Sequence, residues 1–223
     1  MGNKSSDSSR FPAWRSALSL GLVAILGTAL LAGVNHLTRP RIEEQERKAV
    51  LQQLGQIIAP ERYNNALHDD YFTFTDTAWF SSAQPVTAYR ARMDGKPVAV
   101  VLRLAATEGY NGNINLLVGI NFDGSIAGVR VTSHKETPGL GDAIETSRSE
   151  WVLGFDGLSL TNPDENGWAV KRDGGEFDQF TGATITPRAI VKTVKRALEF
   201  FAAERETLFS HPSEPLETKA HHE

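Results

Sequence analysis

Residues 114–132 read INLLVGINFDGSIAGVRVT, and this stretch decides the fold of the 223-residue chain. In its first half apolar residues alternate with polar or small ones, which is the two-residue period of a half-buried strand. Asp123 and Gly124 form a hairpin turn signal, and Ser125–Thr132 returns as a second strand. Gly128 inside that strand indicates a bulge or a close approach of another backbone. The centre of the chain is therefore predicted to be an antiparallel sheet.

The segments on either side of this hairpin add another strand and a helix. Val98–Leu104 is a β-leaning apolar run that comes before the hairpin. After Pro187 the period becomes helical, with an apolar face over Ile190–Phe201. Thr186 is a good N-cap for this helix, and Pro187 suits its first position. Together these elements predict an α+β domain with a mainly antiparallel sheet and flanking helices.

Residues 17–34, ALSLGLVAILGTALLAGV, contain no charged side chain. As a helix they would span about 27 Å, close to the hydrocarbon core of a membrane. We predict a single transmembrane helix over residues 17–37, behind a cytoplasmic N-terminus of residues 1–16. A cleaved signal peptide is the main alternative, but its apolar core is shorter, and Leu30–Ala32 is a poor cleavage site. A buried soluble helix is the third possibility.

Charge and cysteine content limit what the chain can do. It has 23 basic and 27 acidic residues, and the part after residue 38 is the more acidic part, which argues against nucleic acid as the main partner. Basic residues flank both ends of the apolar segment, so charge alone does not orient it. The chain has no cysteine, which excludes disulfides, thiolate-held metal centres and a cysteine nucleophile. Redox chemistry would need a borrowed cofactor.

The rest of the chain divides into three parts. Pro40 opens a helix and Pro60 ends it, so residues 38–60 are predicted to be a stalk helix that packs on the domain, in preference to a helix reserved for a partner. The main domain is predicted over residues 61–209. The polar, proline-bearing residues 210–223 are predicted to be a disordered tail.

Residues 178–187, DQFTGATITP, are the most specific stretch in the chain. Gly182 and Ala183 allow close approach of a ligand, and three threonines offer hydroxyl groups. The free N–H groups at the start of the following helix favour an anion, above all a phosphate. An ordinary Ser/Thr-rich N-cap turn explains the same composition, and composition alone favours that explanation.

The pattern Asp-x-x-Thr-Gly-Ala-Thr, from Asp178 to Thr184, resembles the flavinylation signal of the FMN-binding domain family. In that family a flavin transferase esterifies FMN, through its phosphate, to a threonine hydroxyl. Gly109-Tyr110 before the long strand, the loop Glu136–Gly141 (ETPGLG) and Lys171 shortly before the signal add to the resemblance. It covers most of the chain, from the apolar segment to about residue 201.

Two branches of the family are similar to this chain. One contains the C subunits of the sodium-translocating NADH:quinone reductase. The other contains the G subunits of the Rnf/Rsx ion-translocating electron transport complex. The short stem, the early apolar segment, the total length and the sequence FDQFTGATITP favour the second branch.

The resemblance implies a set of cofactor-binding residues. Thr184 would carry FMN covalently, Thr181 would bond the phosphate, and Asp178 would either guide the transferase or hold the turn. The loop after the hairpin would wrap the isoalloxazine ring, although its glycines and proline alone describe any tight turn. The full set is Tyr110, Glu136, Thr137, Gly139, Leu140, Gly141, Lys171, Asp178, Thr181, Gly182, Ala183 and Thr184. No proton-transfer role is assigned to His134.

The resemblance also implies a function. The chain would be a membrane-anchored electron carrier on the periplasmic side of a bacterial inner membrane, in a complex that couples electron flow between ferredoxin and NAD to ion transport. Its partners would be integral subunits, one with its own covalent FMN, iron–sulfur subunits and a flavin transferase. A module that binds FMN or another phosphate ligand reversibly is the alternative. A hydrolase is weakly supported, because the sequence has neither a Gly-x-Ser-x-Gly elbow nor a His-Glu-x-x-His motif.

Overall fold

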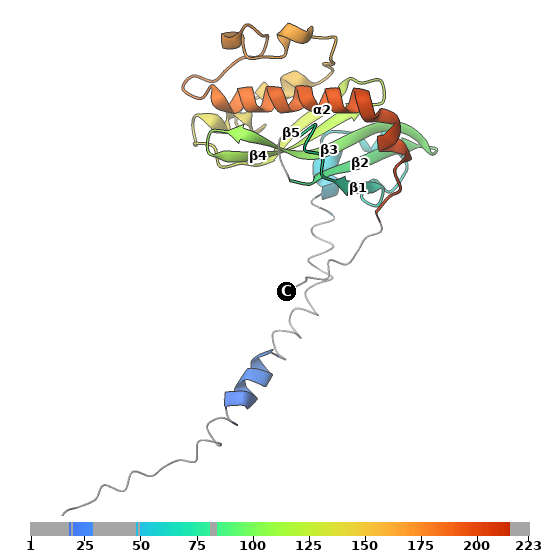
Figure 1. Cartoon of the computed structure of the whole chain (residues 1–223), viewed down its shortest axis with the longest axis vertical. Coiled ribbons are helices and arrows are strands. Elements are labelled where there is room, and N and C mark those ends of the chain that lie inside the picture. Colours follow the sequence, from blue (N-terminus) through green and yellow to red (C-terminus); the bar gives the residue numbers. More distant parts are fainter. Residues whose placement is uncertain (1–17, 19, 29–47, 49, 81–83, 215–223) are drawn as a thin grey trace, which may run out of the picture. The chain divides into compact units, whose positions relative to one another are not determined.

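The computed structural model of the chain describes residues 18, 20–28, 48, 50–80 and 84–214. The chain divides into two compact units, Met1–Lys48 and Ala49–Glu223. In the first unit residues 20–28 are helical (Figure 1). Within the described ranges, no helix is both long and apolar enough to span a membrane. Of the predicted anchor, residues 17, 19 and 29–37 lie outside the described ranges.

The second unit is built on an antiparallel sheet, as predicted, and this sheet has five strands. The strands are β1 (Tyr71–Phe74), β2 (Val86–Met93), β3 (Lys96–Gly109), β4 (Gly112–Asn121) and β5 (Ile126–Ser133). They pair in sequence order, so each strand returns beside the one before it (Figure 1). The hairpin turn predicted at Asp123 and Gly124 joins β4 to β5, and Gly124 has the positive φ of 92° that the turn requires.

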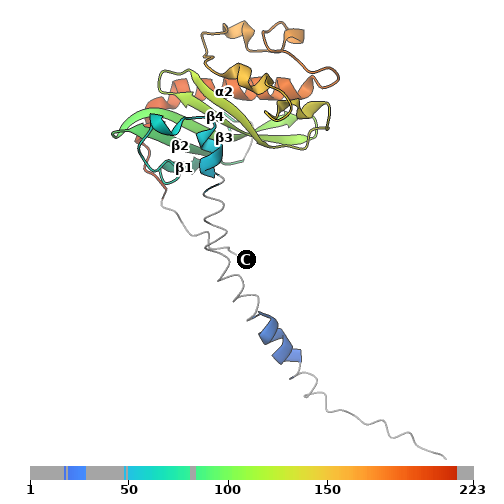
Figure 2. The same cartoon turned by 180° about the vertical axis from the view of Figure 1, so that it is seen from behind.

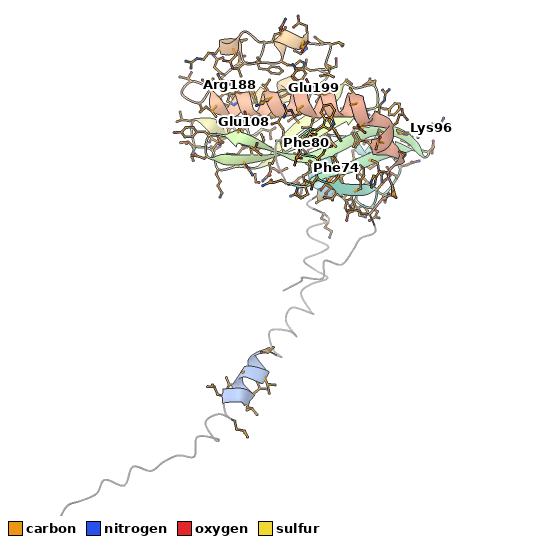
Figure 3. The ribbon with its side chains drawn as sticks, in the orientation of Figure 1. Phe74, Phe80, Lys96, Glu108, Arg188 and Glu199 are labelled. Carbon is orange, nitrogen blue, oxygen red and sulfur yellow. The ribbon has the colours of Figure 1, made fainter. Side chains whose placement is uncertain are left out.

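One face of the sheet is covered by α2 (Ile185–Ser210), which lies across it (Figures 1 and 2). The alternating residues of β4 point to this face, and Leu116 and Val118 are buried with Val194 of the helix. At the β1 end, Phe74 and Phe80 lie against the ring of Phe200, with centroids 5.4 and 5.2 Å from it (Figure 3). The amphipathic period read in the sequence therefore corresponds to the larger core.

The opposite face carries a smaller core made by the chain just before the sheet. Residues 50–55 are helical, and Leu54, Ile57 and Ile58 are buried against this face. Gly119 and Gly128 are paired across β4 and β5. They leave a hollow for Ile57, because a Cβ on Gly119 would lie 2.1 Å from the Cγ2 of Ile57. The sequence predicts a bulge or a close backbone approach at Gly128. The register of the β4–β5 pair shifts beside it, and a Cβ on Gly128 would lie 3.5 Å from the Cα of Ile57.

The helix before the sheet ends earlier than the sequence indicates. Its last helical residue is Gly55, whereas the predicted end is Pro60. The N–H groups of Ile57 and Ile58 both donate to the carbonyl of Leu54, and this turn directs Ile57 into the glycine hollow. Pro60 instead begins the short 3-10 helix η1 (Pro60–Arg62).

The long segment between β5 and α2 packs on the same side of the sheet as α2. It contains four 3-10 helices, η2 (Gly141–Ile144), η3 (Trp151–Phe155), η4 (Glu165–Gly167) and η5 (Lys171–Asp173). Phe155 and Phe177 stack with centroids 4.7 Å apart, and Trp168 is buried beside them. These aromatic rings are part of the larger core and anchor the loop-rich segment to it.

The C-terminal end of α2 is held by arginines of β2. Arg90 is buried, makes an ion pair of 2.6 Å with Asp70 and donates to the carbonyls of Leu208 and His211. Positive groups are favourable at this end of a helix. The chain then follows the edge of β1, where Glu214 accepts a hydrogen bond from the N–H of Thr73. Of the predicted tail, residues 215–223 lie outside the described residues.

Candidate functional site

Three segments of the chain meet at the start of α2. They are the tip of the β3–β4 hairpin at residues 109–112, the loop at residues 134–141 after β5, and the segment at residues 178–186, which is the turn before α2 together with the first two residues of that helix. The side chain of Glu136 connects them, because one of its oxygens accepts from the N–H of Asn111 and the other from the hydroxyl of Thr186. The sequence motifs that lie far apart in the chain are therefore neighbours in the fold.

The turn before α2 is tight. The N–H of Ala183 donates to the carbonyl of Phe180 over 3.1 Å, and Gly182 between them has a φ of +81°. A Cβ on Gly182 would lie 3.4 Å from the side chain of Leu140. This turn and the loop after β5 are thus in contact, and Gly182 supplies both the backbone conformation and the space.

Thr184 occupies the position directly before the helix. It is the N-cap residue of α2, with φ −73° and ψ −28°, and within the described part of the chain its side chain makes no capping hydrogen bond. Its hydroxyl is not used by the helix. The first N–H groups of α2 therefore lack the side-chain acceptor that an N-cap usually supplies.

The prediction that Thr186 is the N-cap is wrong by two residues. The helix begins at Ile185, and Thr186 is buried with its hydroxyl donated to Glu136. That tertiary hydrogen bond draws Thr186 into the first turn. Pro187 still lies in the first turn, where its missing N–H leaves no hydrogen bond unmade.

The loop after β5 closes on itself. The N–H groups of Leu140 and Gly141 both donate to the carbonyl of Thr137, and the N–H of Gly139 donates to a carboxylate oxygen of Asp142 over 2.8 Å. Gly139 has a φ of +78°. The loop is thus a tight turn, and this turn also presents the side chain of Leu140 outward, at 43% exposure.

Each of the three segments exposes one large apolar side chain. Tyr110 is 66% exposed at the hairpin tip, Leu140 43% in the loop and Ile185 43% at the start of α2. In the described part of the domain the only other such side chain is Phe122, at 37%. Apolar groups that gather at one place on a surface indicate a binding site. Ile185 is absent from the predicted set, although its place beside Thr184 in an apolar helix pattern is a usable signal.

Two exposed ion pairs and one indole hydrogen bond hold the turn before α2. Lys171 and Asp178 approach to 2.6 Å, and the indole N–H of Trp151 donates to the carbonyl of Asp178. Arg188 of α2 binds both oxygens of Asp173, at 2.6 and 2.8 Å, and its position is labelled in Figure 3. The hydrogen bond from Arg188 lowers the pKa of Asp173. Asp178 thus contributes to the shape of the turn.

His134 is fixed at the start of the loop by both ring nitrogens. Its Nδ1 accepts from the N–H of Glu136, so its Nε2 carries the proton and donates to Glu145 over 2.7 Å. Hydrogen bonds from His134 and Ser147 lower the pKa of Glu145. The ring therefore connects the loop to Glu145 at the end of η2, and no proton-transfer role follows from this geometry.

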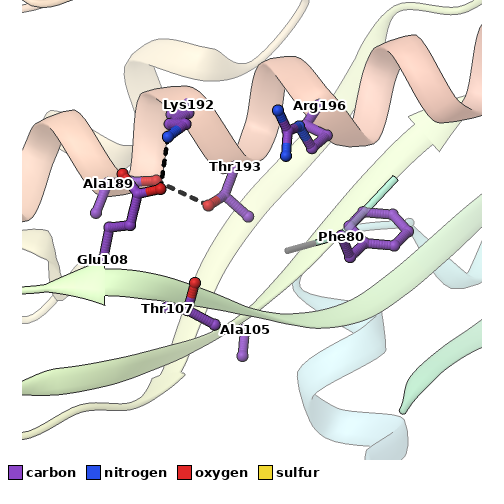
Figure 4. A pocket seen from close by; sticks show the side chains of 8 residues that line it. All are labelled: Phe80, Ala105, Thr107, Glu108, Ala189, Lys192, Thr193 and Arg196. Carbon is purple, nitrogen blue, oxygen red and sulfur yellow. Dashed lines mark hydrogen bonds and ion pairs between the residues drawn. The ribbon is translucent and has the colours of Figure 1, made fainter. Parts of the chain in front are cut away.

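A small hollow lies farther along α2, between the helix and β3, and it is separate from this site. Glu108 and Lys192 form an ion pair of 2.5 Å at its rim, and the hydroxyl of Thr193 donates to the carbonyl of Ala189 (Figure 4). Its volume of about 30 Å³ is close to that of one water molecule. It is too small for a cofactor.

Comparison with known proteins gives matches over most of the chain. The family described as the RnfG N-terminal region matches residues 9–57, and the FMN-binding domain family matches residues 109–199. The G subunit of the ion-translocating oxidoreductase complex of Shewanella loihica is 47% identical over 199 residues, which are 89% of this chain and 94% of that protein. The chain belongs to the family of these G subunits.

Other members support this assignment. The corresponding G subunit of Pseudomonas aeruginosa PAO1 is 48% identical over 196 residues, which cover 88% of this chain and 92% of that protein. That of Vibrio cholerae is 43% identical over 199 residues, covering 89% and 95%. The FMN-binding domain match begins at Gly109 and ends at Glu199, so it contains all three segments of the site. The resemblance inferred from the sequence motifs is confirmed.

Proposed function

We propose that the chain is a membrane-anchored electron-transfer subunit that carries FMN on Thr184 through a phosphoester bond. The observation that carries this proposal is the hydroxyl of Thr184, which among the described residues makes no capping hydrogen bond at the start of α2, in a site whose three segments expose Tyr110, Leu140 and Ile185. FMN has a phosphate at one end and a flat isoalloxazine ring at the other, joined by a ribityl chain, and the site offers groups that suit each end. Membership of the G-subunit family gives the proposal its context.

The residues of the turn suit the phosphate. The phosphate would lie at the N-terminus of α2, where free N–H groups and the helix dipole favour negative charge. Thr181 offers a second hydroxyl, and Gly182 and Ala183 allow close approach. Lys171 and Asp178 hold the turn from outside through their ion pair.

The residues of the hairpin tip and the loop suit the ring. Tyr110, Leu140 and Ile185 expose apolar surface, and Thr137, Gly139 and Gly141 form the backbone turn that carries Leu140. When bound, the isoalloxazine supplies the redox chemistry, and the chain binds and orients it. The absence of cysteine in the sequence agrees with a subunit whose redox centre is attached through oxygen.

A separate flavin transferase would make the bond. A threonine hydroxyl is a weak nucleophile unless a base removes its proton. Within the described residues, the nearby carboxylate of Glu136 accepts from Thr186 and Asn111, so it is already engaged. Thr184 would lose its hydroxyl proton to the transferase, and its oxygen would bond to the flavin-side phosphorus of a flavin dinucleotide donor. The phosphoanhydride bond of that donor would break and release the nucleoside monophosphate.

The remaining parts of the proposal concern the membrane and the partners. Residues 17–37 would anchor the chain in a bacterial inner membrane with the domain on the periplasmic side, and the exposed apolar side chains of the helical residues 20–28 agree with this. The complex would couple electron transfer between ferredoxin and NAD to ion translocation. Its other members would be integral subunits, one with its own FMN, and iron–sulfur subunits.

Mass spectrometry of the full chain, produced together with a flavin transferase, tests the covalent bond. An FMN adduct should appear on the peptide that contains Thr184 and vanish in Thr184→Ala. Thr161→Ala, which removes an exposed loop hydroxyl elsewhere, should keep the adduct. A predominantly unmodified peptide in the wild type would refute the proposal. Flavin fluorescence that leaves the protein band on a denaturing gel would favour the reversible FMN-binding module.

A further inference from the structure

We propose that Glu136 is a positioning residue, a buried carboxylate that fixes the relative places of the three segments that would hold the flavin. The inference rests on the proposed function and gives Glu136 a role other than direct contact with the cofactor. Glu136 is only 4% exposed, although it lies in a surface loop. A buried carboxylate is costly unless donors compensate it, so its partners show what it does.

Both oxygens of Glu136 are directed inward. Oε1 accepts from the backbone N–H of Asn111 at 3.0 Å, and Oε2 accepts from the hydroxyl of Thr186. Asn111 belongs to the hairpin tip and Thr186 to the first turn of α2. One side chain therefore joins the loop after β5 to both other segments of the site.

Two glycines make room for this carboxylate. A Cβ on Gly141 would lie 2.9 Å from the Cβ of Glu136 and 3.0 Å from its Oε2. A Cβ on Gly109 would lie 2.3 Å from the carbonyl oxygen of Gly112 across the hairpin and 3.1 Å from Oε1 of Glu136. The contact with Gly112 excludes a side chain at Gly109, and a side chain at Gly141 would have to displace Glu136 or Thr186. The loop backbone at Gly141 is thus fitted closely to Glu136.

The main chain of Glu136 is held as firmly as its side chain. Its N–H donates to Nδ1 of His134 at 3.0 Å, and His134 is in turn bonded to Glu145. The side chain of Asn111 also reaches the hydroxyl of Thr137, at 3.2 Å. Glu136 is therefore the centre of a hydrogen-bonded network and not an isolated contact.

Each partner of this network lies next to a group proposed to meet the cofactor. Asn111 follows Tyr110, Gly141 follows Leu140, and Thr186 follows Ile185. A shift of the carboxylate would move these neighbours relative to one another and to Thr184. Precise placement of groups that hold a cofactor depends on such supporting hydrogen bonds.

Three variants of the full chain, produced with a flavin transferase, test the role. Glu136→Gln keeps the length, and its amide can accept from Asn111 and donate to the oxygen of Thr186. Glu136→Leu removes both bonds. Thr186→Val keeps the shape of Thr186 and removes one bond, which provides a milder variant if Glu136→Leu does not fold. Glu108→Gln, an exposed carboxylate outside the site, is the matched control.

The readouts are the induced circular dichroism of the flavin band, the flavin fluorescence anisotropy and the midpoint potential. In Thr186→Val the ratio of mobile to docked ring should rise about tenfold, as for loss of one hydrogen bond to a charged group. In Glu136→Leu this ratio should rise further. In Glu136→Gln and Glu108→Gln it should equal the wild-type ratio. If the midpoint potential shifts as much in Glu136→Gln as in Glu136→Leu, Glu136 contacts the flavin directly and the proposal is overturned. The proposal is also overturned if the mobility of the ring is unchanged in both Glu136→Leu and Thr186→Val.

Hydrogen exchange of the chain made without transferase separates the two proposals. If Glu136 fixes the segments, Thr186→Val should speed up amide hydrogen exchange at Asn111 and in the loop at residues 139–141. The exchange rates of β4 should stay unchanged. A wild type without an adduct refutes the proposed function alone. Unchanged hydrogen exchange in Thr186→Val refutes only the positioning role of Glu136.

Discussion

Gly141 shows how little space the site leaves around Glu136. An added Cβ would lie 2.9 Å from the Cβ of Glu136 and 3.0 Å from the hydroxyl oxygen of Thr186. Gly141→Ala must displace these hydrogen-bonded groups, and overpacking of this kind costs about 1–3 kcal/mol. The urea midpoint of the full chain should fall accordingly. Gly154→Ala is the control, since no described heavy atom lies within 4 Å of its added Cβ. An unchanged midpoint in Gly141→Ala would mean that the loop relaxes freely.

Single residues also mark the limit of what the sequence predicts about the site. The motifs predict that Thr184 and the loop after β5 act together, and the fold brings them into contact through Leu140 and Gly182. The predicted helix start is misplaced because Thr186 looks like an N-cap locally. Its hydroxyl is instead donated to Glu136, fifty residues away in the chain. A local pattern carries no information about such a distant partner.

The N-terminus of α2 is an element that a phosphodiester would stabilise. Among the residues described there, the side chain of Thr184 makes no capping bond. A negative charge beside the first turn of a helix contributes about 0.3–1 kcal/mol at low salt. The flavinylated chain should therefore melt at a higher temperature than Thr184→Ala, and added salt should reduce the difference. A difference that does not respond to salt would come from packing of the ring and would contradict this explanation.

The C-terminus of α2 makes the domain sensitive to acid. Partial burial raises the pKa of Asp70, but the hydrogen bond from Arg92 and the charge of Arg90 outweigh it, so the pKa lies below the ordinary 3.8. The folded state thus favours ionised Asp70. Its contribution to stability is present above the ordinary pKa and is lost as the pH falls through the lowered value.

Asp70→Asn tests this link. The variant leaves the guanidinium of Arg90, 1% exposed, without its counter-charge, and breaking a buried pair costs on the order of 3 kcal/mol at neutral pH. The difference in unfolding free energy between Asp70→Asn and the wild type should become smaller at acid pH, because Asp70 of the wild type is then also neutral. Urea unfolding across the acid range measures this convergence. A constant difference at every pH would show that the charge of Asp70 is not what matters.

Elements with strong periodicity could be predicted and the others could not. The β4–β5 hairpin and α2 carry regular apolar patterns, and both occur where expected. The strands β1 and β2 have no such clear signal, because β2 contains Arg90 and Arg92. These arginines are accommodated in the fold by Asp70 and the carbonyls at the end of α2. The burial of Arg90 and the partial burial of Arg92 depend on tertiary partners, so neither can be read from a local pattern.

The whole molecule separates into parts with different tasks. The unit Ala49–Glu223 contains the sheet, both cores and all segments of the candidate site. The unit Met1–Lys48 contains the apolar residues 17–34, which are long enough as a helix for a membrane. Among the described residues, both cores lie within Ala49–Glu223, so we expect binding of the cofactor and attachment to the membrane to be separable.

Removal of the first 37 residues tests this separation. The chain of residues 38–223 should remain in the soluble fraction and still receive FMN on Thr184, while the full chain should sediment with membranes and need detergent for release. A chain that ends at Glu214 should fractionate like the full chain, because it keeps the apolar segment. If residues 38–223 sediment with membranes, the domain itself binds them. If the full chain stays soluble, residues 17–37 are not an anchor, and the electron carrier must be held by its partners alone.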